Sequence, residues 1–163
     1  MPPLPAIIRR PMEKLDALLF DFDGVVADTE SQYTRFWNGV AERYGAAGGG
    51  DFALRIKGTP LKRILAERFA HLGADCLAEI SESLSEFEKR LSFEPVKGAV
   101  EFISAARGRG YKTALVTSSG AEKMRRAFAT TGYGKLFDAL VTAEDIERGK
   151  PDPMGYLAGA AKV

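Results

Sequence analysis

Two carboxylates and a glycine directly follow an apolar run near the start of the chain, in the segment Asp21-Phe22-Asp23-Gly24. An unpaired carboxylate beside a protein core is costly, so an apolar strand that ends in such a cluster points to a function. Two carboxylates this close can divide catalytic work, one attacking as a nucleophile and the other transferring protons. The alternative is a turn in which these residues serve only the backbone, and the tetrapeptide alone does not decide between the two.

The chain alternates strands with helices around this segment. Continuous apolar runs predict three buried strands, at 15–20, 113–116 and 139–142. Helical periodicity predicts two helices in the same part of the chain, at 100–107 and 121–130. Such alternation implies parallel strands with right-handed crossovers, and these sheets carry their sites at the carboxyl ends of the strands. Asp21 and the segment Thr117-Ser118-Ser119 each follow a predicted strand, so we expect them at one edge of the sheet.

A block of helices interrupts this pattern after the first predicted strand. Apolar residues recur at helical spacing in three stretches, at 33–44, 61–72 and 77–91. Residues 30–93 are therefore predicted to form an all-α subdomain inserted into an α/β core that comprises 1–29 and 94–163. The predicted fold class is α/β: a Rossmann-like, three-layer α/β/α core around a parallel sheet, carrying this helical insertion.

The charge balance and the cysteine count narrow the class of protein. The chain has 23 basic and 22 acidic residues, for a net charge of +1. Because a polyanion is bound by clustered positive charge, we expect neither nucleic acid nor a membrane as a partner. The lone Cys76 can form no internal disulfide, and residues 1–12 lack the apolar run of a secretory leader. We therefore expect a cytoplasmic protein, and a monomer.

The nine residues from Asp21 to Thr29 resemble the first motif of the haloacid dehalogenase-like superfamily. The resemblance implies that Asp21 is a nucleophile that forms an aspartyl-phosphate, and that Asp23 is the general acid and base. It also implies that Gly24 belongs to the phosphate-binding loop. The Asp21 side chain and the Asp23 carbonyl would bind Mg2+, a cation that prefers oxygen ligands. True dehalogenases lack the second acid, so Asp23 favours phosphate esters as substrates.

Two later segments resemble further motifs of this superfamily, in the same order along the chain. Thr117-Ser118-Ser119 resembles the motif whose hydroxyl and helix-leading N–H groups hold phosphoryl oxygens, which assigns phosphate binding to Thr117 and Ser118. Gly149-Lys150-Pro151-Asp152-Pro153 resembles the Gly-Lys-Pro-x-Pro motif, whose lysine pairs with the nucleophile and the phosphoryl group. Lys150 is thereby implied to be catalytic. The alternative for each segment is a helix cap or a turn before a helix.

The helical insertion is similar to the cap that one subgroup of this superfamily carries after its first motif. Within it, Arg55-Ile56-Lys57-Gly58-Thr59 resembles the cap segment that faces the active site in sugar-phosphate phosphatases and in the β-phosphoglucomutase-like branch. Arg55 or Lys57 would then contact a second anionic group or sugar hydroxyls of the substrate. The alternative is that both are solvated charges beside a helix start.

These resemblances imply a Mg2+-dependent hydrolase of small phosphate monoesters, such as sugar phosphates or similar metabolites. A β-phosphoglucomutase-like phosphomutase is the nearest alternative. The superfamily has a fourth, acidic motif that completes the magnesium site on a later strand, and this chain ends at Val163 before any such segment. We therefore expect a truncated form of a longer protein, with its first strand left as an exposed edge. The corresponding alternative is an inactive fragment that only binds phosphate ligands.

Overall fold

The computed structural model describes residues 15–46 and 49–163. Its strands are β1 (Ala17–Phe20), β2 (Lys112–Val116) and β3 (Ala139–Val141). Its helices are α1 (Glu30–Tyr44), α2 (Phe52–Ile56), α3 (Leu61–Arg68), α4 (Ala74–Lys89), α5 (Ala99–Gly108), α6 (Ala121–Thr131) and α7 (Met154–Ala161). Short 3-10 turns lie at Gly49–Asp51, Tyr133–Leu136 and Ala143–Asp145. Residues 1–14 lie outside the described residues. They include the first half of the predicted core segment 1–29 and the stretch 1–12 for which no secretory leader was expected.

The three strands form one parallel sheet in the order β1-β2-β3. Phe20 of β1 pairs with Leu115 of β2, and Val116 of β2 pairs with Val141 of β3, so the strands end almost level. The predicted strands and their parallel pairing are confirmed. Because the strands end level, the residues that follow β1 and β2 emerge at the same edge of the sheet.

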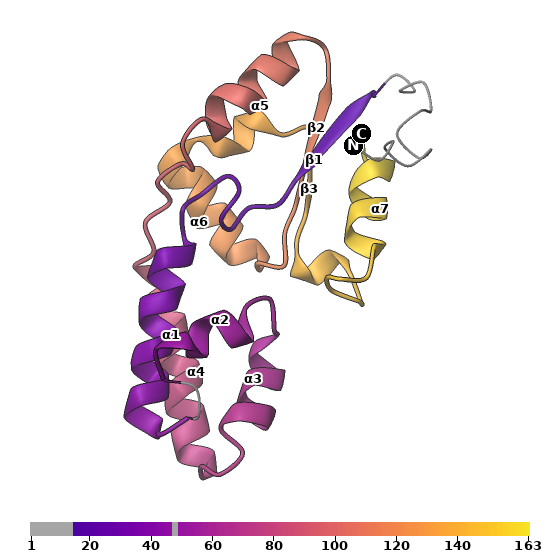
Figure 1. Ribbon diagram of the computed structural model, residues 1–163. Helices are drawn as coiled ribbons and strands as arrows, with labels where there is room; N and C mark the ends of the chain where they lie inside the picture. The colour runs from indigo at the N-terminus through magenta and orange to yellow at the C-terminus, as the bar shows by residue number, and fades with distance from the viewer. Residues whose placement is uncertain (1–14, 47–48) are drawn as a thin grey trace, which may run out of the picture.

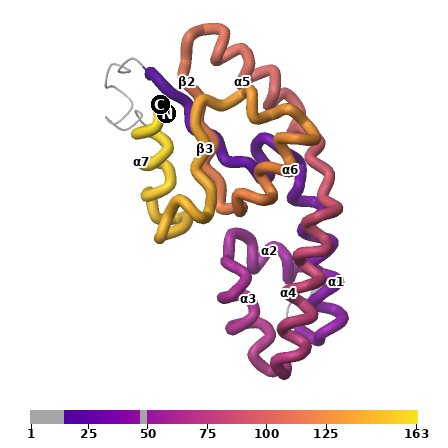
Figure 2. The backbone as a smooth tube through the Cα atoms, turned by 180° about the vertical axis from the view of Figure 1, so that it is seen from behind, coloured from indigo at the N-terminus to yellow at the C-terminus, as the bar shows by residue number. Residues whose placement is uncertain are grey.

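Helices cover both faces of the sheet. Helices α5 and α6 lie on one face and α7 lies on the other, as the two opposite views in Figures 1 and 2 agree. Helix α7 approaches the sheet closely because it has glycines on its inner side. A Cβ atom added to Gly159 would lie 2.6 Å from Val116 Cγ2 and 3.1 Å from Leu19 Cδ2. The fold is thus the predicted Rossmann-like three-layer α/β/α arrangement.

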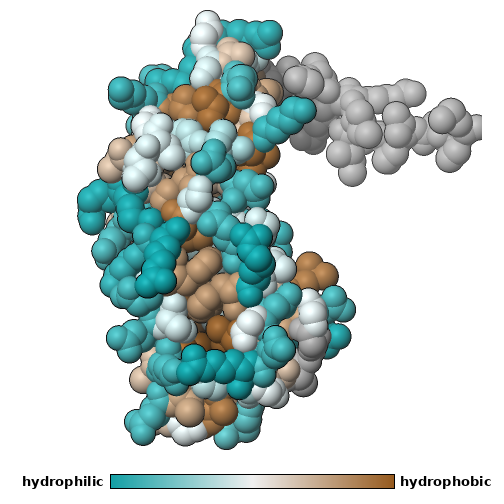
Figure 3. Space-filling model, turned by 90° about the vertical axis from the view of Figure 1, so that its left-hand side faces the viewer, coloured by the Kyte–Doolittle hydropathy of each residue, from teal (hydrophilic) through white to brown (hydrophobic). Residues whose placement is uncertain are grey.

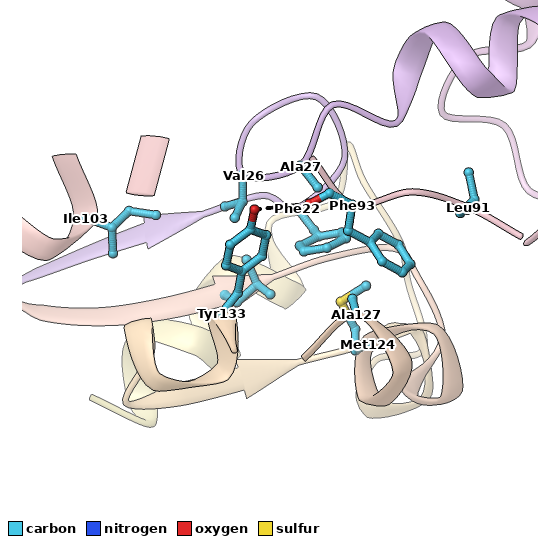
Figure 4. Close-up of a cluster of buried hydrophobic side chains, with 10 residues drawn as sticks. Phe22, Val26, Ala27, Leu91, Phe93, Ile103, Met124, Ala127 and Tyr133 are labelled. Atoms are coloured by element: carbon cyan, nitrogen blue, oxygen red, sulfur yellow. Dashed lines mark hydrogen bonds between the residues drawn. The ribbon is translucent and has the colours of Figure 1, made fainter. Parts of the chain in front are cut away.

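The main core fills the space between the sheet and the helices α5 and α6, and Figure 4 shows its central side chains. Its members come from β2, α5 and α6, from the segments after β1 and α4, and from the 3-10 turn after α6: Phe22, Val26, Ala27, Leu91, Phe93, Ile103, Leu115, Met124, Ala127 and Tyr133. The only polar atom among these side chains, the hydroxyl of Tyr133, donates to the carbonyl of Phe93 at 3.1 Å. Phe22, the residue after Asp21, is one of these core residues, and its burial anchors the start of the segment Asp21-Phe22-Asp23-Gly24.

Helices α1 to α4 form a group below the sheet in Figure 1, with a hydrophobic cluster of their own. This second cluster comprises Trp37, Val40, Ala41, Phe52, Ala53, Ile56, Ile64, Phe69 and Ile80. The chain enters and leaves the group through two segments that run side by side. The N–H of Asp28 donates to the carbonyl of Glu94 at 2.8 Å, and the N–H of Val96 donates to the carbonyl of Val26 at 3.0 Å.

The helical group differs in detail from the periodic pattern of the sequence. Helix α1 ends as predicted at Gly45, whose φ of 67° is the left-handed conformation that glycine adopts at helix ends. The stretch 61–72 was predicted as one helix, but α3 ends at Arg68. Phe69 is fully buried, so the chain leaves the helix at the residue that enters the core. Helix α2 was not predicted, because five residues are too few to show a period.

The surface is polar over most of the face shown in Figure 3, with apolar side chains only in small areas between charged ones. In the part of the chain that the structure describes, no helix has the length and apolar character that crossing a membrane requires.

Candidate active site

The first polar segment turns sharply where β1 ends. The N–H groups of Val26 and Ala27 both donate to the carbonyl of Phe22, at 2.9 and 3.0 Å, and close the turn. Gly24 has a φ of 73°, and a Cβ atom there would lie 2.8 Å from Cγ of Glu30. Only glycine satisfies both the backbone conformation and the close approach. The turn sends the chain from the sheet edge into helix α1.

Asp21 forms an ion pair with Lys150. The Lys150 Nζ atom lies 2.7 Å from Oδ2 of Asp21 and donates to the carbonyl of Val116 at 3.1 Å. The other carboxylate oxygen of Asp21 accepts the N–H of Phe22 at 2.8 Å. The structure therefore brings together the residue after β1, the last residue of β2 and the lysine before α7, which lie far apart in the sequence. The Asp21 side chain keeps 32% of its surface exposed, so a ligand can reach it.

Asp23 points into a separate group of polar side chains. Its Oδ1 accepts hydrogen bonds from Thr29 Oγ1 at 2.6 Å and Lys123 Nζ at 2.7 Å, and its Oδ2 accepts one from Ser119 Oγ at 2.7 Å. Burial of Asp23 raises its pKa, but the charge of Lys123 and these hydrogen bonds lower the pKa by more. The net effect places the pKa of Asp23 below its ordinary value, so in this arrangement the group is a carboxylate.

Lys123 connects Asp23 to the helical group. It lies on α6, its side chain is only 7% exposed, and it also donates to the hydroxyl of Tyr33 at 3.0 Å. Tyr33, on α1, in turn donates to Oε1 of Glu88, on α4, at 2.7 Å. Burial first, and then the negative charge of Glu88, raise the pKa of the Tyr33 hydroxyl, which therefore stays protonated as a donor.

The segment after β2 places its three hydroxyls differently. Thr117 is 1% exposed, and its Oγ1 accepts the N–H of Ser119 at 3.0 Å. Ser118 is exposed, whereas Ser119 bonds to Asp23. The N–H of Ala121, at the start of α6, donates to both carboxylate oxygens of Glu144, at 3.1 and 3.0 Å. A carboxylate thus lies at the helix terminus, where its negative charge is favoured.

The two basic residues singled out in the helical insertion lie in different surroundings. Arg55 is exposed in the last turn of α2. Lys57 follows this helix, and its Nζ lies 3.1 Å from Oε1 of Glu30. Glu30 is the side chain that closely approaches Gly24, so Lys57 lies near the turn after β1. Both lysine and glutamate side chains are more than one-third exposed, so this ion pair adds little stability.

Oxygen atoms suited to a hard cation are present at the end of β1. Among the described residues, no hydrogen bond is accepted by the backbone carbonyl of Asp23, and the carboxylate of Asp21 is accessible. Within the same described part, no group of three or more His, Cys, Asp or Glu residues could by itself surround a metal ion. Mg2+ typically keeps several waters and takes one or two protein carboxylates plus substrate phosphate oxygens. The donors at Asp21 and Asp23 fit this partial coordination.

Sequence reasoning assigned no role in the site to Lys123, Tyr33 or Glu88. The partners lie between 55 and 100 residues apart, and no local pattern connects them. One signal was present in the sequence. Lys123 shares a helical face with Met124 and Ala127, which are both fully buried. A charged side chain on such a face is rarely buried unless it is paired with an opposite charge or hydrogen-bonded.

Comparison with known proteins assigns the chain to a family. The model of the haloacid dehalogenase-like hydrolase family matches residues 18–162. The phosphorylated carbohydrates phosphatase of Thermotoga maritima is 33% identical over 156 residues, which cover 88% of this chain and 68% of that protein. The validoxylamine A 7'-phosphate phosphatase of Streptomyces hygroscopicus subsp. limoneus is 28% identical over 148 residues, with 89% of this chain and 70% of that protein covered.

A solved structure shows the same fold. The β-phosphoglucomutase of Clostridium difficile superposes with a TM-score of 0.72 at 20% identity, over 91% of this chain and 71% of that chain. The family model matches nearly the whole chain, and the structure places Asp21 and Lys150 together at the edge of the sheet. These observations agree on the family. The chain belongs to the haloacid dehalogenase-like hydrolase family.

Proposed function

We propose that this protein hydrolyses small phosphate monoesters, with sugar phosphates as the preferred class, through a covalent aspartyl-phosphate on Asp21. The observation that carries the proposal is the ion pair of 2.7 Å between Asp21 and Lys150 at the carboxyl ends of the strands. A nucleophilic carboxylate and a phosphate dianion repel each other, and an adjacent ammonium offsets that repulsion. The relatives reported above are named as a phosphorylated carbohydrates phosphatase and a validoxylamine A 7'-phosphate phosphatase, and the first of these names supports the substrate class.

The reaction has two steps that regenerate the enzyme. In the first, an Asp21 carboxylate oxygen bonds to phosphorus while the ester P–O bond breaks, and Asp23 donates a proton to the departing oxygen. In the second, a water molecule attacks phosphorus, Asp23 takes a proton from that water, and the bond from Asp21 to phosphorus breaks. The products are an alcohol and inorganic phosphate, and Asp23 ends protonated for the next turnover.

The lowered pKa of Asp23 suits the second step directly, because a carboxylate can accept a proton. The first step needs the protonated form. A bound phosphate dianion raises the pKa of a neighbouring carboxyl by repulsion between like charges, so substrate binding itself favours protonation of Asp23.

Other residues bind the reacting groups in this proposal. Thr117, Ser118 and the turn at Gly24 hold the phosphoryl oxygens. The Asp21 carboxylate and the Asp23 carbonyl would hold Mg2+, which would supply positive charge against the phosphoryl oxygens.

Residues 30–93 act in the proposal as a cap over the site. Both connections of this segment to the rest of the chain pass through the two segments that the isolated β-bridge between Ala27 and Pro95 joins, which allows the helices to move together as one body. Lys57 is the cap residue with the stronger support as a substrate contact, because it lies near the turn after β1. Arg55 is the second candidate. Closure of the cap would exclude bulk water before the chemical step.

The test is a phosphate-release assay on a panel of small phosphate esters with Mg2+ and with EDTA. Wild type should release phosphate only with Mg2+, and Asp21→Asn should lose activity by at least about a thousandfold, since it removes the nucleophile. The matched control is Asp16→Asn, an exposed carboxylate at the opposite end of the same strand, which should remain active. Activity in the Asp21→Asn variant would contradict the proposal.

Two other outcomes distinguish the alternative functions. Interconversion of sugar phosphate isomers without net phosphate release would indicate a phosphomutase. Saturable phosphate binding without turnover, measured by calorimetry with inorganic phosphate, would indicate a phosphate-binding fragment.

A further inference from the structure

The ammonium of Lys123 is buried and fully bonded beside the proposed proton-transfer group. An ammonium has three N–H donors, and those of Lys123 reach Asp23 Oδ1 at 2.7 Å, Ser119 Oγ at 2.9 Å and Tyr33 OH at 3.0 Å. Burial of a charged side chain is costly and is offset only where partners of this quality surround it. A lysine on the apolar face of α6 contributes less to packing than an apolar residue would, so its presence there needs another reason.

We propose that Lys123 is a positioning residue, which orients the carboxyl group of Asp23 for proton donation to the leaving oxygen. The inference rests on the proposed function, because it takes Asp23 as the proton donor. Lys123 contacts Oδ1 of Asp23 directly, and it also contacts the Ser119 hydroxyl that holds Oδ2. Lys123 therefore acts at Oδ1 directly, beside Thr29, and at Oδ2 through Ser119, and a carboxyl held at both oxygens has one orientation.

The same lysine ties this orientation to the helical group. It lies 4.8 Å from the ring centre of Tyr33 on α1, and the Tyr33 hydroxyl also bonds to Glu88 on α4. One turn along α6, the guanidinium of Arg126 donates to the backbone carbonyls of Glu88 and Lys89, near the end of α4. Helix α6 thus contacts Asp23 and also the helices α1 and α4. A displacement of α1 or α4 would therefore move Lys123 relative to Asp23.

Two substrates that differ in their leaving group distinguish a positioning role of Lys123 from a merely structural one. An alkyl phosphate releases a strongly basic alkoxide that must be protonated as it departs, whereas p-nitrophenyl phosphate releases a weakly basic phenolate that needs no proton. The ratio kcat/KM covers the steps from free substrate to leaving-group departure, so it reports this first proton transfer. A loss of folded protein lowers kcat/KM equally for both substrates, and the ratio between the two is unaffected.

The decisive variant is Lys123→Met, which keeps an unbranched side chain of nearly the same length and removes the ammonium. For the best sugar phosphate of the panel, kcat/KM should fall about a hundredfold, the lower range of a lost general acid. For p-nitrophenyl phosphate it should fall by less than about threefold. The matched control is Arg125→Met, which removes an exposed cation from the same helix and should change neither value.

Two further variants test the same route. Tyr33→Phe keeps the ring under Lys123 but removes the hydroxyl that Lys123 and Glu88 share, and it should lower kcat/KM for the sugar phosphate about fivefold, the effect of one hydrogen bond. The double variant Asp23→Asn with Lys123→Met should be no slower on the sugar phosphate than Asp23→Asn alone, because Lys123 acts through Asp23.

Several outcomes overturn the inference. The inference is wrong if Lys123→Met lowers kcat/KM for both substrates by the same factor. It is also wrong if this variant leaves kcat/KM for the sugar phosphate unchanged or raises it. Additive losses in the double variant would also overturn it, since Lys123 would then act independently of Asp23. A wild-type protein that hydrolyses neither ester would overturn the proposed function and this inference with it, whereas full activity of Asp21→Asn would overturn only the former.

Discussion

Helix α7 follows the segment that carries Lys150, and the closeness of this helix to the sheet can be tested by adding a single methyl group. In Gly159→Ala the new Cβ would lie 2.6 Å from Val116 Cγ2 and 3.1 Å from Leu19 Cδ2. Contacts this short require a shift of the helix or of these two side chains, and such overpacking costs about 1–3 kcal/mol.

The matched control is Gly39→Ala in α1, where the added Cβ meets no atom within 4 Å. Alanine is favoured over glycine in a helix interior by about 1 kcal/mol, so this variant should be more stable than wild type. Both variants gain helix propensity, and the difference between them isolates the contact with the sheet. We expect that difference to be about 2 kcal/mol, which corresponds to melting temperatures about 4–8 °C apart for a chain of this size.

The assay is thermal unfolding followed by circular dichroism at 222 nm, with both variants and wild type at the same protein concentration. Gly159→Ala should melt at the lower temperature of the two variants. If it were as stable as Gly39→Ala, helix α7 would not lie against β1 and β2 at the stated distances, and the position of Lys150 that depends on this helix would be in doubt.

The remaining predictions concern charge. Lys150→Met should lower kcat/KM by about a hundredfold or more, since it removes the cation beside the Asp21 nucleophile, and Lys150→Arg should restore part of the loss; an unchanged rate in steady-state kinetics would refute the role. The N–H of Thr113, and then the Arg107 guanidinium, hold the pKa of Asp138 below its usual value although burial opposes this. The stability this gives is present above the unfolded pKa of about 3.9 and is lost as pH falls through the lower folded pKa. Asp138→Asn should therefore melt below wild type at pH 7, and the gap should close towards pH 2; a constant gap would contradict the assignment.

Local patterns predicted most of the regular structure. The apolar runs that became β1, β2 and β3 lie in a sheet that helices cover on both faces, and such strands have no alternation of polar and apolar residues to obscure them. The parallel order followed from the helices between them, because a crossover connection permits little else. The end of α1 was predictable at Gly45, since glycine adopts the left-handed conformation without strain. Helix α2 escaped prediction because it completes little more than one turn.

The polar segments were recognisable one by one, but their partners were not. Asp21 and Lys150 were paired in advance only through resemblance to a family, and the structure gives the distance between them. The bonds of Asp23 to Ser119 and Lys123 were not foreseen, nor was the exposure of Ser118. A one-residue difference along the loop after β2 decides which hydroxyl faces Asp23, and neither composition nor periodicity specifies it.

The sequence by itself determined which residues can react and at which ends of which strands they lie, because residue type and hydrophobic period are local properties of the chain. Only the tertiary structure decided which charges meet. Lys123, Tyr33 and Glu88 come together through the packing of α6 against α1 and α4, and a contact between distant segments depends on how whole helices dock. The electrostatics of Asp23 are therefore a property of the assembled fold, whereas its presence after an apolar strand is a property of the chain.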